Sequence, residues 1–206
     1  MQQITKEQVI VLETIAKKAA ILASTSLSKF IHMPVQLELT RTRMIEVSEI
    51  NQLITDSEEI SSVVLLPVTG DFVGSSALIS SIQDSYHLAE ILLKRPKGSI
   101  TKLDELATSA IKETANIIGG AFLSTLSNTT GFSLIQSIPN KATGTMKEIV
   151  DMAVKELHHI DNELTIALEI DFSLSATTTE IITHYVFFLD VDFAQKLLEA
   201  LQKSGT

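Results

Sequence analysis

Apolar residues recur every three to four positions through two long stretches of the chain, residues 5–31 and about 101–127. This spacing predicts two long amphipathic helices, the first opening with Thr5 and Gln8 at capping-box spacing. Shorter apolar runs predict strands, among which Pro67 is expected at a strand edge or a bulge. The predicted strands are 34–40, two within 61–81 around Gly70-Asp71, 132–139, 163–174 and 180–191, and the shorter helices are 84–95 with Asp84 as cap, 146–159 and 192–203.

The order of these elements repeats along the chain. At an offset of 100 residues, the identical pairs are Glu13 and Glu113, Thr14 and Thr114, Ser24 and Ser124, and Thr25 and Thr125. Residues 96–99, Pro-Lys-Gly-Ser, are the clearest linker between the two halves. We therefore predict an α+β protein of two pseudo-two-fold related halves, each with a long helix, about three strands and a closing helix.

The two repeats are expected at about residues 5–95 and 101–203. Either repeat alone would bury only a small core, which is marginal for an independent domain. We therefore expect the halves to share one compact β-sheet core within a single domain, 1–206.

The second long helix carries a narrow polar strip. At about 100° per residue, Ser109, Glu113, Asn116 and Gly120 fall within about 60° of one another, away from the apolar side. Glu113 and Asn116 are neighbours on the helix surface and could enter one crevice of a partner together. An exposed Glu and Asn are also common as solvated residues, and a Gly-Gly pair is common where helices cross closely. The strip alone leaves both interpretations open.

A longer pattern favours a function for this strip. Ser109, Glu113 and Asn116 fit the spacing Asp or Ser, three residues, Glu, two residues, Asn, and 22 residues separate Asn116 from Pro139. This pattern resembles the signature of the CheC/CheX/FliY family of chemotaxis response-regulator phosphatases. Length, internal duplication and element order extend the resemblance over essentially the whole chain.

The resemblance implies a protein phosphatase of chemotaxis signal transduction that hydrolyses the aspartyl-phosphate of the receiver CheY without a covalent intermediate. Asn116 would orient the attacking water, and Glu113 would pair with the receiver's active-site lysine. The receiver would supply Mg²⁺, so the chain would need no cofactor of its own. An amide suits this task because it hydrogen-bonds water without the repulsion that a carboxylate meets beside a phosphoryl group.

Four further positions are expected to support this surface rather than to take part in the chemistry. Ser109 would trim or cap it, and Pro139 would fix the strand that packs below the helix. Gly119 and Gly120 would admit the partner's backbone or, equally, a close helix contact.

The first repeat departs from the pattern. It keeps Glu13 but has Ala16 opposite Asn116, Val9 opposite Ser109 and Ala20 opposite Gly120. Family members often carry the pattern twice, but an alanine cannot orient water. We infer a degenerate first site, with Glu13 either solvated or part of a docking surface, and Ala16→Asn as a route to a second site.

Composition narrows the remaining possibilities. The absence of cysteine excludes disulfides, thiolate metal sites and a cysteine nucleophile, and the cytoplasm is the expected compartment. Sixteen Lys and Arg against twenty-five Asp and Glu give a formal charge of −9, which makes nucleic acid an unexpected partner. No apolar run approaches the ~20 residues that span a membrane. The five histidines have no ligand pattern, so no metal site is predicted.

A second class of function stays open on the sequence. The chain could be a binding protein without catalysis, similar to the family's flagellar-switch relatives or to a regulator that binds the deamidase CheD or a receiver. Because the given sequence ends directly after the closing helix, without the added C-terminal module of the switch proteins, we do not expect a rotor component. Because duplication already supplies a two-fold arrangement, we expect a monomer.

Overall fold

The computed structural model describes residues 5–46, 60–145, 148, 165–176 and 179–204. Its helices are α1 (Lys6–Ile31), α2 (Ile82–Leu92), α3 (Glu105–Thr130) and α5 (Val191–Ser204). Its strands are β1 (Gln36–Glu46), β2 (Ser61–Gly70), β3 (Gly74–Ser81), β4 (Leu134–Gln136), β5 (Asn140–Gly144), β6 (Thr165–Ala176) and β7 (Thr179–Asp190). These seven strands form a single antiparallel sheet, which confirms the predicted α+β class. Apart from Glu148, the helix predicted over 146–159 lies outside the described residues.

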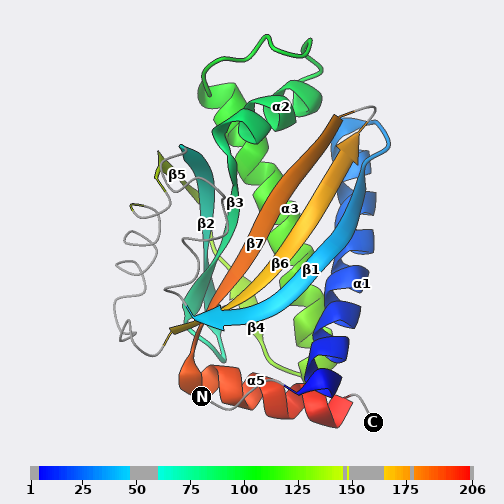
Figure 1. Ribbon diagram of the computed structural model, residues 1–206, viewed down its shortest axis with the longest axis vertical. Helices are drawn as coiled ribbons and strands as arrows, with labels where there is room; N and C mark the ends of the chain where they lie inside the picture. Colours follow the sequence, from blue (N-terminus) through cyan, green and yellow to red (C-terminus); the bar gives the residue numbers. More distant parts are fainter. Residues whose placement is uncertain (1–4, 47–59, 146–147, 149–164, 177–178, 205–206) are drawn as a thin grey trace.

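The strands of the two halves are arranged in mirrored order across the sheet (Figure 1). The order is β1-β6-β7-β3-β2-β4, and β5 also pairs with β2. The first strand of the N-terminal half, β1, therefore pairs with the β6–β7 hairpin of the C-terminal half. In return, β4 and β5 pair with the β2–β3 hairpin of the N-terminal half. Each half thus completes the sheet of the other.

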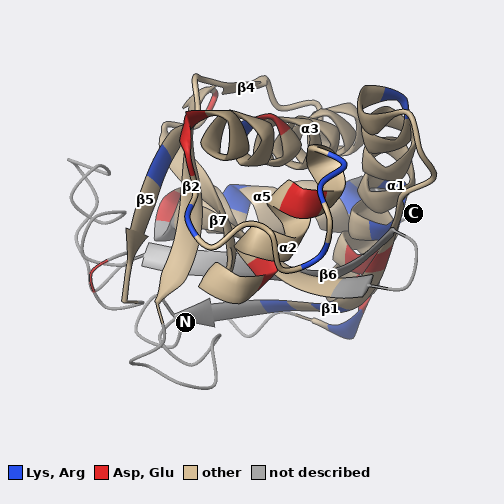
Figure 2. Cartoon of the chain, turned by 90° about the horizontal axis from the view of Figure 1, so that it is seen from above, with Lys and Arg blue, Asp and Glu red and all other residues tan. Residues whose placement is uncertain are grey.

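The two long helices lie side by side on one face of the sheet and bury its apolar residues (Figure 2). Leu12 of α1 and Phe122 of α3 are fully buried, and the Phe122 ring lies 5.1 Å from that of Tyr185 on β7. Burying a large apolar side chain of this kind typically stabilises a fold by about 1.5–3 kcal/mol. This packing fixes which face of α3 remains exposed.

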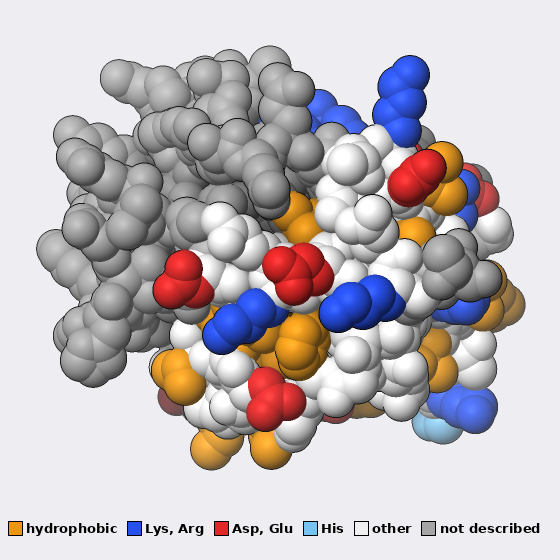
Figure 3. Space-filling model, turned by 90° about the horizontal axis from the view of Figure 1, so that it is seen from below, with side chains coloured by type: hydrophobic (Ala, Val, Ile, Leu, Met, Phe, Trp, Pro, Cys, Tyr) orange, Lys and Arg blue, Asp and Glu red, His pale blue; other side chains and the backbone are white. Residues whose placement is uncertain are grey.

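Helix α5 closes one end of the layered structure, below the sheet and the long helices in Figure 1. Its buried Phe193 stacks on Phe72 with ring centroids 4.4 Å apart and also contacts Phe132, which follows α3. Seen from this end, acidic and basic side chains are interspersed around apolar ones (Figure 3). The ring contacts of Phe193 hold the end of α3 that leads into β4.

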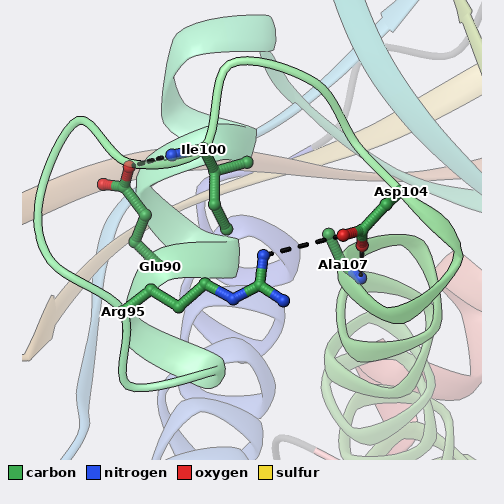
Figure 4. Close-up of polar contacts among 5 residues, drawn as sticks. All are labelled: Glu90, Arg95, Ile100, Asp104 and Ala107. Atoms are coloured by element: carbon green, nitrogen blue, oxygen red, sulfur yellow. Dashed lines mark hydrogen bonds and ion pairs between the residues drawn. The ribbon is translucent and has the colours of Figure 1, made fainter.

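At its other end, helix α3 begins with an aspartate as its N-terminal cap. Asp104 accepts a hydrogen bond from the Ala107 N–H at 2.8 Å, and its second oxygen lies 3.6 Å from an Arg95 nitrogen (Figure 4). The bond from Ala107, together with Arg95, lowers the pKa of the Asp104 carboxyl. The negative charge of a carboxylate at this position also interacts favourably with the helix dipole.

A second carboxylate holds the connector that leads into α3. Glu90 of α2 is buried and accepts a hydrogen bond from the Ile100 N–H at 2.9 Å (Figure 4). Burial by itself raises the pKa of this carboxyl, but backbone N–H groups of residues 98–100 and the nearby His87 outweigh it, so the pKa is lowered. The linker predicted at 96–99 is thus anchored to α2.

One local prediction is wrong, one is confirmed in part, and one strand was missed. Helix α2 is capped by Ser81, whose hydroxyl accepts from the Asp84 N–H at 3.0 Å, so Asp84 lies in the first turn and is not the cap. Pro67 lies at a bulge, one of the two places expected for it, although its strand has partners on both sides. Strand β5 was not predicted, because Asn140–Gly144 has no apolar alternation and forms a strand only against β2.

Candidate active site

The polar strip of α3 is exposed as its spacing predicts. Ser109 and Glu113 are exposed, and Asn116 and Gly120 are half-buried. On the opposite side of the helix, Thr114 and its apolar neighbours are buried in the core. The structure therefore brings the four predicted strip residues onto one accessible face.

Asn116 is held at the side of this face by a residue that the sequence did not single out. The Nε2 atom of Gln136, the last residue of β4, donates to Asn116 Oδ1 at 2.6 Å and to the Asn116 backbone oxygen at 3.3 Å. Leu134 and Gln136 alternate with Ile135 along β4, and both are partly buried whereas Ile135 is exposed. The sequence contained one indication of this role, because the alternation along the strand places the polar Gln136 on the inward face.

The two glycines of the Gly-Gly pair have different surroundings. A Cβ at residue 119 would overlap Gln136 Oε1 and lie 3.1 Å from a methyl carbon of Leu66, whereas a Cβ at residue 120 would meet nothing within 4 Å. Gly119 therefore packs closely against β4 and β2, so the close contact is with the sheet and not with another helix. Gly120 leaves the strip open beside Glu113 and Asn116, which agrees with room for a partner.

Pro139 lies at a β-bulge next to this site. Val68 pairs with Gln136 and Leu65 pairs with Asn140, so two residues of β2 face the three residues 137–139. Pro67 and Pro139 are both in this interval, where a missing N–H costs the ladder little. The Ser137 N–H donates to the Pro67 oxygen at 2.8 Å. The bulge thus ends β4 directly after Gln136.

A pair of lysines lies along the same side of α3. Lys112 precedes Asn116 by one helical turn, and burial together with the charge of Lys112 lowers the pKa of Lys141 on β5. The Lys141 Nζ donates to Thr143 Oγ1 at 2.8 Å. Although the whole chain is acidic, this flank of the strip is locally basic.

Within the described residues of the first repeat, the matching face of α1 does not form a comparable surface. Glu13 is half-buried, but Ala16 is 0% exposed and belongs to the hydrophobic core. A side chain at position 16 points into the core and not toward a partner. The suggested route to a second site through Ala16→Asn is therefore wrong.

The described part of the chain shows neither a candidate metal site nor a membrane-spanning helix. It contains no cluster of three or more His, Asp or Glu side chains suited to a metal ion. None of its helices is both long and apolar enough to cross a membrane.

No protein-family model matches the chain. The CheY-P phosphatase CheC of Bacillus subtilis is 22% identical to it over 205 residues, which are 98% of this chain and 97% of that protein. The resemblance to the CheC/CheX/FliY family is confirmed. FliY of Thermotoga maritima has the same fold, with a TM-score of 0.78 at 18% identity, covering 99% of this chain and 100% of the FliY chain.

Two other solved structures share the fold less closely. FliM in a FliG–FliM complex from H. pylori has a TM-score of 0.65 at 12% identity, covering 95% of this chain and 99% of the FliM chain. A CheX–CheY–BeF3–Mg complex from Borrelia burgdorferi matches with a TM-score of 0.51 at 18% identity, covering 84% and 96% of the two chains. The fold of this chain is thus shared with FliY, FliM and CheX.

Proposed function

We propose that this chain hydrolyses the aspartyl-phosphate of a CheY-type response regulator. The observation that carries the proposal is the position of Asn116, which lies on the accessible strip of α3 beside Glu113 with its amide already held. The similarity to a protein named CheY-P phosphatase supports the same reaction.

In this reaction a water oxygen forms a new bond to phosphorus while the phosphorus–oxygen bond to the receiver's aspartate breaks. The products are inorganic phosphate and the free carboxylate. Because the transition state of phosphoryl transfer is loose, alignment and charge stabilisation contribute more than proton abstraction. Asn116 cannot act as a base, but its amide can orient the water by hydrogen bonding. Mg²⁺ would be held by the receiver and would neutralise charge on the phosphoryl group.

Glu113 and the neighbouring surface would hold the receiver in register. The exposed Glu113 carboxylate would pair with the receiver's active-site lysine, and the basic flank of Lys112 and Lys141 would favour the negatively charged phosphoryl group. Leu106 lies seven residues before Glu113, about 20° from it around the helix, and is 57% exposed. A receiver that covers the strip would also bury this leucine.

One observation favours a second function. The fold is closer to FliM, with a TM-score of 0.65, than to CheX, with a TM-score of 0.51. A protein of this fold could therefore bind a receiver or CheD without catalysis, through the same α3 face.

The rate of phosphate release from a phosphorylated CheY-type receiver distinguishes these functions. A phosphatase accelerates release in proportion to its concentration and turns over many receivers. A binding protein leaves the rate unchanged or slows it, even when it forms a complex with the receiver.

A further inference from the structure

We infer that Gln136 is a positioning residue that sets the rotamer and the amide orientation of Asn116. The inference rests on the proposed function and concerns a residue of β4, outside the strip of α3. It starts from the two hydrogen bonds that the Gln136 amide makes with Asn116.

The backbone oxygen of Asn116 fixes the orientation of the Gln136 amide. A carbonyl oxygen can only accept, so the Gln136 atom that lies 3.3 Å from it must be the donor Nε2. The same Nε2 has a second N–H, and the Asn116 side-chain atom 2.6 Å away must then be the acceptor Oδ1. The Asn116 backbone carbonyl therefore determines which atom is nitrogen and which is oxygen in both side-chain amides. The flipped orientation of either amide would break at least one of these hydrogen bonds.

Gln136 can impose this order because its own backbone is fixed. It pairs with Val68 of β2 at the end of β4, and the next residue, Ser137, donates to the Pro67 oxygen at 2.8 Å. On its other side the Oε1 atom is buried against Gly119 and has no hydrogen-bond partner. A buried oxygen without a hydrogen-bond partner costs free energy. The presence of glutamine at this position therefore fits a side chain whose role is the hydrogen bonds that its Nε2 donates to Asn116.

The hydrogen bond from Gln136 determines which atoms of the Asn116 amide remain available to bind water. With one lone pair of Oδ1 engaged by Gln136, the second lone pair and the two Nδ2 N–H groups are left for a water molecule. The hydrogen bond from Gln136 also polarises the Asn116 amide and strengthens its N–H donors. A free asparagine would sample several rotamers and both amide orientations, and only a fraction of them would align a water with the phosphorus–oxygen bond.

The test compares Gln136→Met and Gln136→Glu with the wild type and with Gln83→Met, a matched change of an exposed glutamine on α2. Methionine keeps the length of the side chain but donates no hydrogen bond. Glutamate keeps its shape and places an acceptor against two oxygens, so it should be the worse variant. We expect kcat for dephosphorylation to fall about tenfold in Gln136→Met and further in Gln136→Glu, with KM within about twofold and binding of a beryllofluoride-activated receiver retained. Gln83→Met should match the wild type.

An unchanged kcat, or a rise in KM with kcat intact, overturns the inference, because Gln136 would then be inert or a docking contact. Urea unfolding identifies a variant that fails to fold, and the other variant then decides. A second readout does not depend on phosphatase activity. In side-chain amide NMR spectra, the Gln136 Nε2 protons should exchange more slowly than those of Gln83, and Gln136→Met should shift the Asn116 Nδ2 signals. Equal exchange for both glutamines overturns the inference even if the wild type proves inactive, and inactivity with slow exchange contradicts only the proposed function.

Discussion

Ala16 and Asn116 occupy equivalent positions in the two repeats, yet Ala16 is wholly buried while Asn116 is partly exposed and hydrogen-bonded to β4. The two long helices therefore present different faces to solvent, although their sequences align without a gap. The difference between the repeats lies in the surroundings of the helix as well as in the residue itself.

Ala16→Asn is expected to destabilise the protein without creating a second site. An amide in this part of the core lacks a partner and needs space that the packing does not provide, at a cost of about 2–4 kcal/mol. Urea unfolding measures the loss, with the exposed neighbour Lys17→Asn as the control, for which about 0.7 kcal/mol or less is expected. Full stability together with a doubled rate of phosphate release would contradict this account of the first repeat.

Gly119→Ala and Gly120→Ala should differ in their effect on the free energy of unfolding. Alanine at 120 meets open space and should raise the free energy of unfolding by about 0.5–1 kcal/mol through helix propensity. Alanine at 119 would displace Gln136, so it should give no such gain and should lower kcat. Denaturation and phosphate-release assays on both variants check this, and equal effects on stability would show that Gly119 is not a packing position.

Stability should depend on pH through Glu90. Its folded-state pKa lies below the unfolded value of about 4.3, so the stabilisation is fully present above that value and is lost as pH falls toward the folded pKa. Glu90→Gln is expected to be less stable than the wild type by roughly 1–2 kcal/mol at pH 7, and the gap should narrow at pH 3.5. A gap of the same size at both pH values would mean that the carboxylate charge is not what holds the connector.

Leu106→Ser should weaken recognition of the receiver and leave the chemistry unaffected. Removing an exposed leucine that is buried only in the complex should raise KM roughly tenfold at unchanged kcat, with little change in the free energy of unfolding. Ile10→Ser on α1, where the isoleucine is 60% exposed, is the matched control. If both variants raise KM equally, the loss is not specific to the α3 strip.

Much of the fold was predictable because its signals are local. The helical period of α1 and α3, the capping box at Thr5 and the short apolar runs of β2 and β3 are all read from neighbouring residues. The cap of α2 was misassigned because Ser81 and Asp84 are both good capping residues, and only the end of β3 decides between them. Strand β5 depends on pairing with β2 and leaves no pattern of its own.

The candidate site also combines local features, which the sequence predicts, with long-range contacts, which it does not. Glu113, Asn116 and Gly120 lie on one helix, so their common face follows from helix geometry. Gln136 lies twenty residues beyond Asn116 on a three-residue strand, and its contact depends on the bulge and on the space left by Gly119. The distinction between Gly119 and Gly120 likewise depends on what packs against each of them.

In the proposed reaction, Asn116 orients the water that attacks the receiver's aspartyl-phosphate. The most direct measurement is the rate of phosphate release from a labelled, phosphorylated CheY-type receiver with wild type, Asn116→Ala and Asn128→Ala, the last an exposed asparagine farther along α3. We expect wild type and Asn128→Ala to accelerate release, whereas Asn116→Ala should lose about 10²-fold or more of kcat and still bind the receiver. Equal acceleration by Asn116→Ala, or no acceleration by the wild type, would contradict this proposal.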